Sequence, residues 1–318
     1  MQIIQGVENY IPGPRPLFLA LGNFDGVHLG HQKLIKDLVL KSEQNQGIAG
    51  AFLFDPHPTR VINPSNAPKL LVANERKAEL FADLGMDALI YHPFTAEIAH
   101  WSPREFVQRV LVEQLQVKEV FVGFNHTFGH KGQGDPAMLT SLGAEFGFVV
   151  NVTQPVKVSD MIVSSSLIRQ MLDEGNIEMA ADLLGYNPVI QGTVISGERR
   201  GSSIGFPTAN LEFDPELNIP ATGVYAGMVL SGDNYYKAVI NIGTKPTFHE
   251  EFPLTVEVHI IDFNQNIYGK RLQISFLHKL RDQKKFNSLE ELRNQIAADR
   301  DEAARVTKGP SETTEKVR

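Results

Sequence analysis

The sequence predicts two domains of different fold class, an α/β domain followed by a mostly antiparallel β domain. The chain has 318 residues, and single hydrophobic cores usually stop growing below this length, so two cores are expected. From Leu17 to about Val152, short apolar runs alternate with stretches of helical period. After Gly185, β-rich runs are separated by glycine-rich or polar turns. The expected boundaries are 1–185 for the first domain, 186–306 for the second and 307–318 for a polar tail.

Composition narrows the class of protein further. Hydrophobic residues make up 42% and charged residues 21% of the chain, as in ordinary globular proteins. Cysteine is absent, which excludes disulfides, zinc ribbons and thiol nucleophiles. A net charge of −7 disfavours a nucleic-acid partner, and no apolar run is long enough to span a bilayer. The N-terminus shows no leader pattern, so we expect a cytoplasmic protein with no membrane partner.

In the first domain, five apolar runs are continuous rather than alternating, which is typical of a parallel sheet covered on both faces. They read LFLALGNF, IAGAFLF, DALIYH, EVFVGF and FVVNV. One intervening helix has a clear start, because Ser102 can cap it, Pro103 suits its first turn and Glu105 completes a capping box. Its apolar face would comprise Phe106, Val110 and Leu111. This pattern predicts a doubly wound, Rossmann-like sheet whose ligands bind beyond the carboxyl ends of the strands.

Two short helical stretches, SSSLIRQMLDEG and EMAADLLG, precede the second domain. Its predicted strands lie in VIQGTVISG, GVYAGMVL, YYKAVINIG, TVEVHIIDF and RLQISFLHKL. The domain ends in an amphipathic helix in which Ser288 and Glu291 form a capping box. We expect Leu289, Leu292 and Ile296 to pack back on the sheet, and the tail from Thr307 to be frayed.

The loop after the first predicted strand, GNFDGVHLGHQKL, suits an anion. Its glycines permit tight turns, and His28 and His31, three residues apart at a helix start, can face the same side. Backbone N–H groups at a helix N-terminus attract phosphate, and the imidazoles add donors for a transition state that gains negative charge. Either histidine could instead be an ordinary cap or surface residue. A zinc site would need a third ligand, and His57, His126 and His130 have no close metal-binding spacing to the pair.

The His-x-Gly-His signature after the first strand resembles that of nucleotidyltransferases, which transfer AMP or CMP from a nucleoside triphosphate and release pyrophosphate. The longer string GNFDGVHLGHQ resembles the prokaryotic bifunctional riboflavin kinase and FMN adenylyltransferase family, also called FAD synthetases. LFDPHP and VGFNHTFGHKGQGD resemble the loops of that family after later strands, although family members more often have an aspartate-phenylalanine pair at Asn125 and His126.

The resemblance implies a set of residues for adenylyl transfer, in which an FMN phosphate oxygen attacks the α-phosphorus of ATP with the help of magnesium. His28, His31 and Arg169 would stabilise the developing charge. The VSSSLIR segment resembles the family's Ser-Ser-Thr-x-Ile-Arg motif, with Ser166 in place of threonine; without the resemblance, its serines could simply cap the following helix. ATP and phosphate contacts are implied for Gly22, Asn23, Phe24, Asp25, Gly30, Asn125, Ser164, Ser165 and Ser166.

In the second domain, GFPTANL resembles the riboflavin kinase signature, and GVYA, NIGTKPTF, VEVHIIDF and YGK follow in the family's order. The resemblance implies a barrel of about six strands. Glu257 would be the base that accepts the proton of the ribityl hydroxyl, although the strand pattern alone is equally compatible with an exposed carboxylate. Thr208 and Asn210 offer hard oxygen ligands for Mg²⁺. ATP or flavin contacts are implied for Gly197, Gly201, Gly205, Phe206, Pro207 and Arg281.

One departure from the family pattern concerns the kinase. Ser202 stands where the family commonly has arginine, and Arg199 or Arg200 could compensate for it. The resemblance therefore implies a bifunctional enzyme that acts on riboflavin, FMN and ATP. The alternatives are an FMN adenylyltransferase with a weakened kinase domain, and a flavin or nucleotide sensor without turnover. Self-association is left open by the sequence.

Overall fold

The computed structural model describes residues 1–197, 205–244 and 254–307, and its chain divides into two compact units. The first unit comprises Met1–Lys69 and Ala73–Ser164, and the second comprises Leu70–Val72 and the chain from Ser165 onward. Each unit is described by itself. Gly201 and Ser202, together with Arg199 and Arg200, lie outside the described residues.

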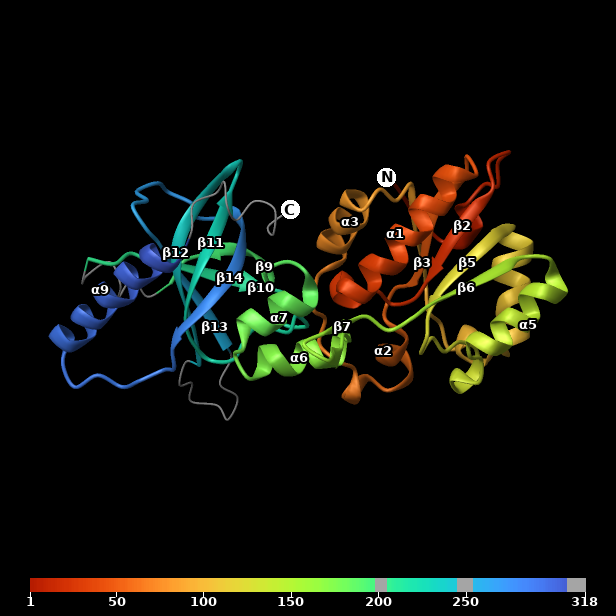
Figure 1. Cartoon of the computed structure of the whole chain (residues 1–318). Coiled ribbons are helices and arrows are strands. Elements are labelled where there is room, and N and C mark those ends of the chain that lie inside the picture. Colours follow the sequence, from red (N-terminus) through yellow and green to blue (C-terminus); the bar gives the residue numbers. More distant parts are fainter. Residues whose placement is uncertain (198–204, 245–253, 308–318) are drawn as a thin grey trace. The chain divides into compact units, whose positions relative to one another are not determined.

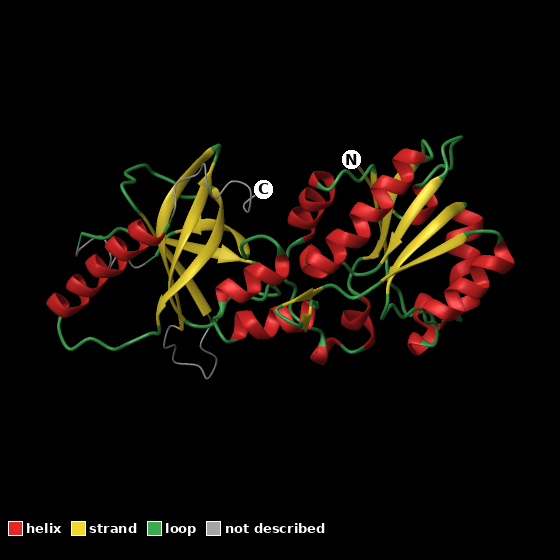
Figure 2. Ribbon diagram, in the orientation of Figure 1, coloured by secondary structure: helices red, strands yellow, loops and turns green. Residues whose placement is uncertain are grey.

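The first unit is built on a six-stranded sheet in which all neighbouring strands are parallel (Figures 1 and 2). Its order, β1-β4-β3-β2-β5-β6, confirms the predicted Rossmann-like α/β layer. The strands are β1 (Gln2–Gln5), β2 (Leu17–Leu21), β3 (Ile48–Phe54), β4 (Ala88–His92), β5 (Val117–Gly123) and β6 (Val149–Thr153). The sequence pattern missed β1, because this short edge strand buries only Ile4 and therefore has no apolar run.

Helices flank this sheet (Figure 2). The helical segments are η1 (Val7–Asn9), η2 (Asp25–Val27), α1 (Leu29–Gln44), α2 (Pro58–Ile62), η3 (Pro64–Asn66), α3 (Asn74–Asp83), η4 (Ile98–His100), α4 (Pro103–Phe106), η5 (Val107–Gln114), η6 (His130–Gly132) and α5 (Pro136–Phe146). The predicted capping box is confirmed, since the Ser102 N–H donates to Glu105 Oε2 (2.9 Å) and the Glu105 N–H donates to Ser102 Oγ (3.2 Å). The helix continues into a π-helical segment, and its predicted apolar face is buried at Phe106, Val110 and Leu111.

The sheet order locates the place where a ligand can enter. The chain runs from β2 outward through β3 to β4, and then returns to the other side of β2 to form β5 and β6. The connections that follow β2 and β5 therefore leave the sheet in opposite directions, and such a switch point opens a crevice at the carboxyl ends of the strands. The two loops there are the histidine-containing loop and the glycine-rich loop that the sequence singled out.

In the second unit, six strands close into an antiparallel barrel in the order β10-β13-β12-β11-β14-β9. They are β9 (Val189–Ile195), β10 (Ala209–Phe213), β11 (Gly223–Ser231), β12 (Asn234–Thr244), β13 (Leu254–Ile260) and β14 (Arg271–Arg281). Tyr225, Ile240 and Phe276 are fully buried in its core. The barrel confirms the expected fold, and β10, within the PTANL signature, is the strand that the apolar pattern did not reveal.

The helices α6 (Ser165–Asp173) and α7 (Ile177–Leu184) group with the barrel by contacts, whereas the change in sequence character suggested a boundary after Gly185. Three contacts tie them there. The Ala221 N–H donates to the Leu172 carbonyl (2.9 Å), Asn218 Nδ2 donates to Asp173 Oδ1 (3.1 Å), and Glu178 Oε1 lies 2.9 Å from His278 Nδ1. A two-stranded ribbon, β7 (Lys157–Val158) with β8 (Met161–Ile162), lies just before them in the chain.

The C-terminal helix α9 (Leu289–Val306) corrects one expectation. Ser288 caps it as predicted, because Ser288 Oγ accepts from the Glu291 N–H (3.1 Å), while Glu291 Oε2 accepts from the N–H of Asn287 (2.9 Å). The expectation that Leu289 packs on the sheet is wrong, since it is 72% exposed. Figure 1 shows the reason: the first turns of α9 project beyond the barrel, and only its last turns lie on the strands.

The end of α9 packs on the outer face of the barrel. Ala303 is buried against Val224, Ala226 and Val239. Thr307, which was expected to be frayed, is 1% exposed because it follows this packed end directly.

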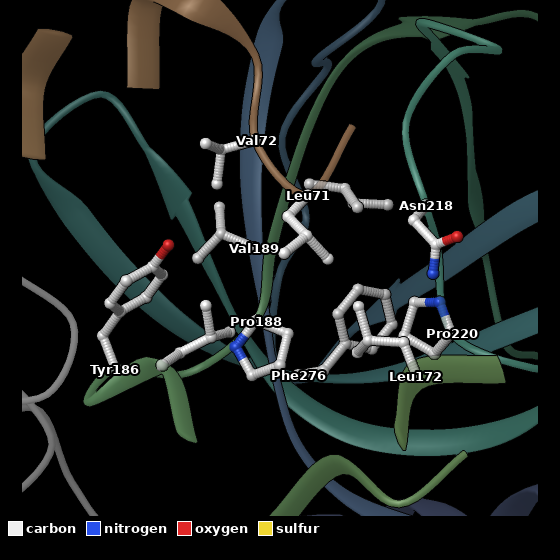
Figure 3. Close-up of a pocket in the computed structure, with 11 residues that line it drawn as sticks. Leu71, Val72, Leu172, Tyr186, Pro188, Val189, Asn218, Pro220 and Phe276 are labelled. Atoms are coloured by element: carbon white, nitrogen blue, oxygen red, sulfur yellow. The ribbon is translucent and has the colours of Figure 1, made fainter. Parts of the chain in front are cut away.

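A three-residue strap, Leu70–Val72, packs with the second unit although it precedes α3 of the first. The Leu70 N–H donates to the Glu216 carbonyl (2.8 Å), and the Asn218 N–H donates to the Leu70 carbonyl (2.7 Å). Leu71 and Val72 are buried, and Figure 3 shows them around an apolar pocket with Val189 and Phe276. No pattern in the sequence indicated that these three residues pack with the second unit.

Candidate active sites

The loop between β2 and α1 has a backbone shape that its residues fix. Phe24 adopts a left-handed conformation (φ 48°), and its buried ring packs edge-on against Phe81 and His31, at centroid distances of 5.4 and 5.1 Å. Gly26 has φ 78°, which a side chain rarely adopts. A Cβ atom at Gly30 would lie 3.2 Å from the His28 ring. The glycines therefore let the loop fold tightly around the two histidines.

His28 and His31 stack face to face at the start of α1, with ring centroids 3.6 Å apart and an interplanar angle of 15°. His28 is the N-cap residue, and its Nδ1 accepts from the His31 N–H (3.4 Å). Nδ1 of His31 is buried and has no hydrogen-bond partner among the described residues. The structure thus brings the predicted pair together at a helix N-terminus.

Burial controls the charge of the pair. It lowers the pKa of His28 to about 4, and burial, His28 and the Lys77 cation together lower the pKa of His31 well below its usual range. Both imidazoles are therefore neutral near pH 7. Because Nδ1 of His28 accepts a hydrogen bond, its own proton resides on Nε2, which leaves one N–H available to an anion.

A buried lysine of α3 contacts this loop. The sequence pattern did not reveal it. Lys77 on α3 is 6% exposed, and its Nζ donates to the carbonyl of Asn23 (3.2 Å). Lys77 shares the buried face of α3 with Leu80 and Phe81, at the i+3 and i+4 positions. That pattern was the available signal, since a lysine on an otherwise apolar helix face is unusual.

The loop after β3 lies next to the same helix. Asp55 Oδ2 accepts from Asn74 Nδ2 (3.0 Å) at the start of α3, and Tyr91 Oη on β4 donates to the Asn74 carbonyl (3.4 Å). His57 caps α2 by accepting from the Thr59 N–H (3.2 Å). This loop is thereby fixed to the carboxyl edge of the sheet.

The glycine-rich loop after β5 holds one buried imidazole. Asn125 is exposed, whereas the His126 ring stacks on Phe128 at 5.9 Å, and its Nε2 is buried without a partner among the described residues. Burial lowers the pKa of His126 to about 4. His130 Nδ1 lies 2.9 Å from the Ala99 carbonyl. No group of three His, Cys, Asp or Glu side chains that could hold a metal is found in the described ranges.

The serine motif is divided between the units. Ser164 ends the first unit, and Ser165, Ser166 and Arg169 lie on α6 of the second. Ser166 is exposed, and Arg169 is half-buried. The structure therefore places Ser164 in the unit of the histidine pair, and Ser165, Ser166 and Arg169 in the other unit.

In the second unit, a row of polar side chains crosses the barrel. Glu257 on β13 lies directly opposite Asn210 on β10 and Asn241 on β12. Directly opposed residues of neighbouring strands point to the same face, and the buried side chains of Val256 and Val258 occupy the interior face. The row therefore lies on the outer face, where Glu257, the candidate base, and Asn210, a candidate metal ligand, are direct neighbours.

Two side-chain amides of this region, those of Asn241 and Gln283, were not among the predicted site residues. Gln283 Nε2 donates to Asn241 Oδ1 (2.7 Å) and to the Ile242 carbonyl (2.9 Å), so it extends the row beyond β12. The signal in the sequence was an asparagine inside the apolar strand YYKAVINIG.

The segment before β10 supports the row. Phe206 is buried, with the His259 ring at 5.5 Å and the Arg300 guanidinium at 5.8 Å from its ring centre. His259 Nδ1 lies 2.8 Å from the Pro207 carbonyl, and Thr208 is half-buried. A Cβ atom at Gly197 would lie 2.1 Å from Asn210 Nδ2, so a larger residue there would displace the Asn210 amide. Gly205 has φ 91°.

Arg281 is held by a carboxylate of α9. Its Nε donates to Asp299 Oδ1 (3.0 Å) and its Nη2 donates to Asp299 Oδ2 (2.7 Å), and the Asp299 side chain is 6% exposed. In this geometry Arg281 anchors the helix to β14. The contact to ATP or flavin implied for it stays a prediction.

Known families match both units. A family model described as FAD synthetase matches residues 11–167, and one described as riboflavin kinase matches residues 184–307. A bifunctional riboflavin kinase/FMN adenylyltransferase of Bacillus subtilis is 38% identical, over 90% of this chain and 91% of its own length. The Escherichia coli K12 protein of the same name is 35% identical, over 94% of this chain and 96% of its own length.

A solved structure gives the same fold. The crystal structure of a protein named a macrolide-efflux protein, from Streptococcus pneumoniae, matches with a TM-score of 0.87 and 28% identity, over 96% of this chain and 99% of that chain. Within the described ranges of this chain, no helix has the length and apolar character to cross a membrane. With relatives above 30% identity over nearly the full length, the chain belongs to the family of bifunctional riboflavin kinases and FMN adenylyltransferases, which are transferases that form FMN and FAD.

Proposed function

We propose that residues 1–185 transfer AMP from ATP to FMN, and that residues 186–306 phosphorylate riboflavin. The stacked pair of neutral histidines at the switch point of the sheet carries the first assignment. The row of Asn210, Glu257 and Asn241 supports the second. Riboflavin, FMN and ATP are then the partners of the chain, and the need for ATP favours a cytoplasmic location.

In the adenylyl transfer, a phosphate oxygen of FMN forms a bond to the α-phosphorus of ATP, and the bond from that phosphorus to the bridging oxygen of pyrophosphate breaks. Negative charge grows on the oxygens around phosphorus. The Nε2–H of His28, a donor from His31 and the free N–H groups of α1 stabilise this charge, because they are preorganised in a largely buried loop. Gly22, Asn23, Phe24, Asp25 and Gly30 shape that loop. Ser164, Ser165, Ser166, Arg169 and Asn125 complete the proposed triphosphate contacts.

In the kinase reaction, the ribityl hydroxyl oxygen forms a bond to the γ-phosphorus of ATP while ADP leaves. Glu257 accepts the hydroxyl proton. Asn210 and Thr208 offer hard oxygen atoms beside this carboxylate, and such a donor set fits Mg²⁺, which would neutralise charge on the phosphates. Gly197, Gly205, Phe206 and Pro207 would line the bound substrates.

The test measures each half-reaction by itself. FMN with ATP and magnesium reports adenylylation, and riboflavin with the same additions reports phosphorylation. We expect His28→Ala combined with His31→Ala to abolish FAD formation and to leave phosphorylation unchanged, while Glu257→Gln does the reverse. Loss of both activities in either folded variant would refute the assignment of one reaction to each part of the chain.

A further inference from the structure

Lys77 is a buried cation beneath the histidine loop. Its side chain extends from α3 and is 6% exposed, and its Nζ donates to the carbonyl of Asn23 (3.2 Å), directly before the left-handed Phe24. A lysine on an amphipathic helix normally extends its ammonium to water, because burying a charge is costly. At this position the ammonium contacts the loop backbone instead.

Carboxylates of two loops act on the charge of this ammonium. Burial lowers the pKa of Lys77, while Asp25 in the β2 loop and Asp55 in the β3 loop raise it. Asp25 is 4% exposed. Asp55 is also tied to α3, since it accepts from Asn74, which lies one turn before Lys77. Lys77 therefore connects the loops after β2 and β3 through charge and through its helix.

The incoming substrate makes this cation important. ATP brings several negative charges to a loop that already contains the buried carboxyl of Asp25. The two imidazoles of the loop cannot compensate, because both are neutral near pH 7. The ammonium of Lys77 can offset the negative charge of Asp25. Its hydrogen bond also holds the Asn23 carbonyl in place.

We propose that Lys77 is a positioning residue of the adenylyl-transfer site, whose buried ammonium holds the Asn23 carbonyl and offsets the charge of Asp25 and Asp55, so that the loop accepts the triphosphate of ATP. This inference rests on the assignment of adenylyl transfer to the same loop. Lys77 acts through the loop, and its loss should weaken the use of ATP more than the use of FMN.

The experiment compares Lys77→Met, Lys77→Gln and Lys77→Arg in the full chain. FAD formation is measured with ATP and FMN varied separately, and riboflavin phosphorylation is measured in the same preparations. We expect Lys77→Met to raise the KM for ATP more than 10-fold with less than a twofold change in the KM for FMN. Lys77→Gln, which keeps a donor but no charge, should behave like Lys77→Met, and Lys77→Arg should restore most of the ATP affinity.

The matched control is Lys33→Met on α1, because Lys33 is exposed and pairs with Asp37 (3.0 Å). It should leave both KM values unchanged. A KM for ATP within twofold of wild type in Lys77→Met would overturn the inference, and so would full activity of Lys77→Gln. If Lys77→Met fails to fold, as judged by Trp101 fluorescence, the KM values for ATP of Lys77→Gln and Lys77→Arg test the inference instead. If the double histidine variant keeps FAD formation, the proposed function itself fails, which is a separate result.

Discussion

Three imidazoles of the first unit are held neutral by burial, and this makes the unit sensitive to acid. The pKa values of His28 and His126 lie at about 4, against an ordinary value of 6.5. Between these two values the unfolded chain binds protons that the folded chain does not. Stability is therefore full above pH 6.5 and is lost as the pH falls towards 4.

His126 allows this to be measured without touching the histidine pair. Replacing it with phenylalanine, an aromatic residue that does not titrate, removes the titration and also the unpartnered Nε2. The linkage relation predicts that the gain in unfolding free energy over wild type is about 2 kcal/mol larger at pH 5 than at pH 7.5. Denaturant unfolding followed by Trp101 fluorescence measures both values. His100→Phe, at an exposed position, serves as the control, and an equal gain at both pH values would contradict the account.

Single residues were predictable where their type and their spacing from a near neighbour in the sequence determine the contact. The His28 and His31 pair and the Ser102 cap lie where their local spacing placed them. Lys77 and Gln283 could not be found in this way, because their partners are distant in sequence and only the fold brings Asn23 and Asn241 to them.

At the scale of elements, α9 is fastened to the barrel by an apolar contact, by an ion pair and by the hydrogen bond that Lys237 Nζ donates to the Ala304 carbonyl (2.6 Å). Ala303 supplies the apolar contact, and Asp299 accepts from both Arg281 and Gln295 (2.7 Å). Breaking a buried ion pair by removing one charge leaves the other charge uncompensated, which is more costly than the loss of a surface pair.

We therefore expect Asp299→Asn to lower the unfolding free energy of the second unit by about 3 kcal/mol. Thermal inactivation of riboflavin phosphorylation and circular dichroism both report this loss. Glu302→Gln removes an exposed pair with Arg305 on the same helix and should change little. Equal effects of the two substitutions would show that Asp299 does not anchor α9.

Long apolar runs and helix caps were predictable elements, because their signals are local. The short strands β1 and β10 were not, since their few buried residues form no period and their pairing with β4 and β13 is set by the whole sheet. Leu289 shows the same limit, because an apolar helix face indicates burial but not which turns reach the barrel.

At the scale of the whole molecule, the strap Leu70–Val72 packs with the second unit although it lies in sequence between two segments of the first. Its residues lie inside the stretch that matches FAD synthetases, yet they pack with the barrel unit. Leu71 is 6% exposed, and truncating a buried leucine removes contacts without letting the surroundings close completely.

Leu71→Ala should thus destabilise the second unit by about 2–4 kcal/mol, although it lies before α3 of the first. The expected observation is inactivation of riboflavin phosphorylation at a lower temperature, with the Trp101 transition of the first unit little changed. Leu40→Ala, at a position 56% exposed on α1, is the control. A shift confined to the Trp101 transition would contradict the placement of the strap.

If two separate sites perform the two reactions, two variants that each lack one site should complement each other in a mixture. Riboflavin, ATP and magnesium are supplied to the His28→Ala, His31→Ala double variant, to Glu257→Gln, and to an equal mixture of both, and the flavins are separated chromatographically. The account predicts that the first accumulates FMN only, that the second leaves riboflavin unchanged, and that the mixture forms FAD. FAD from either variant alone, or a folded variant without any activity on riboflavin and FMN, would contradict it.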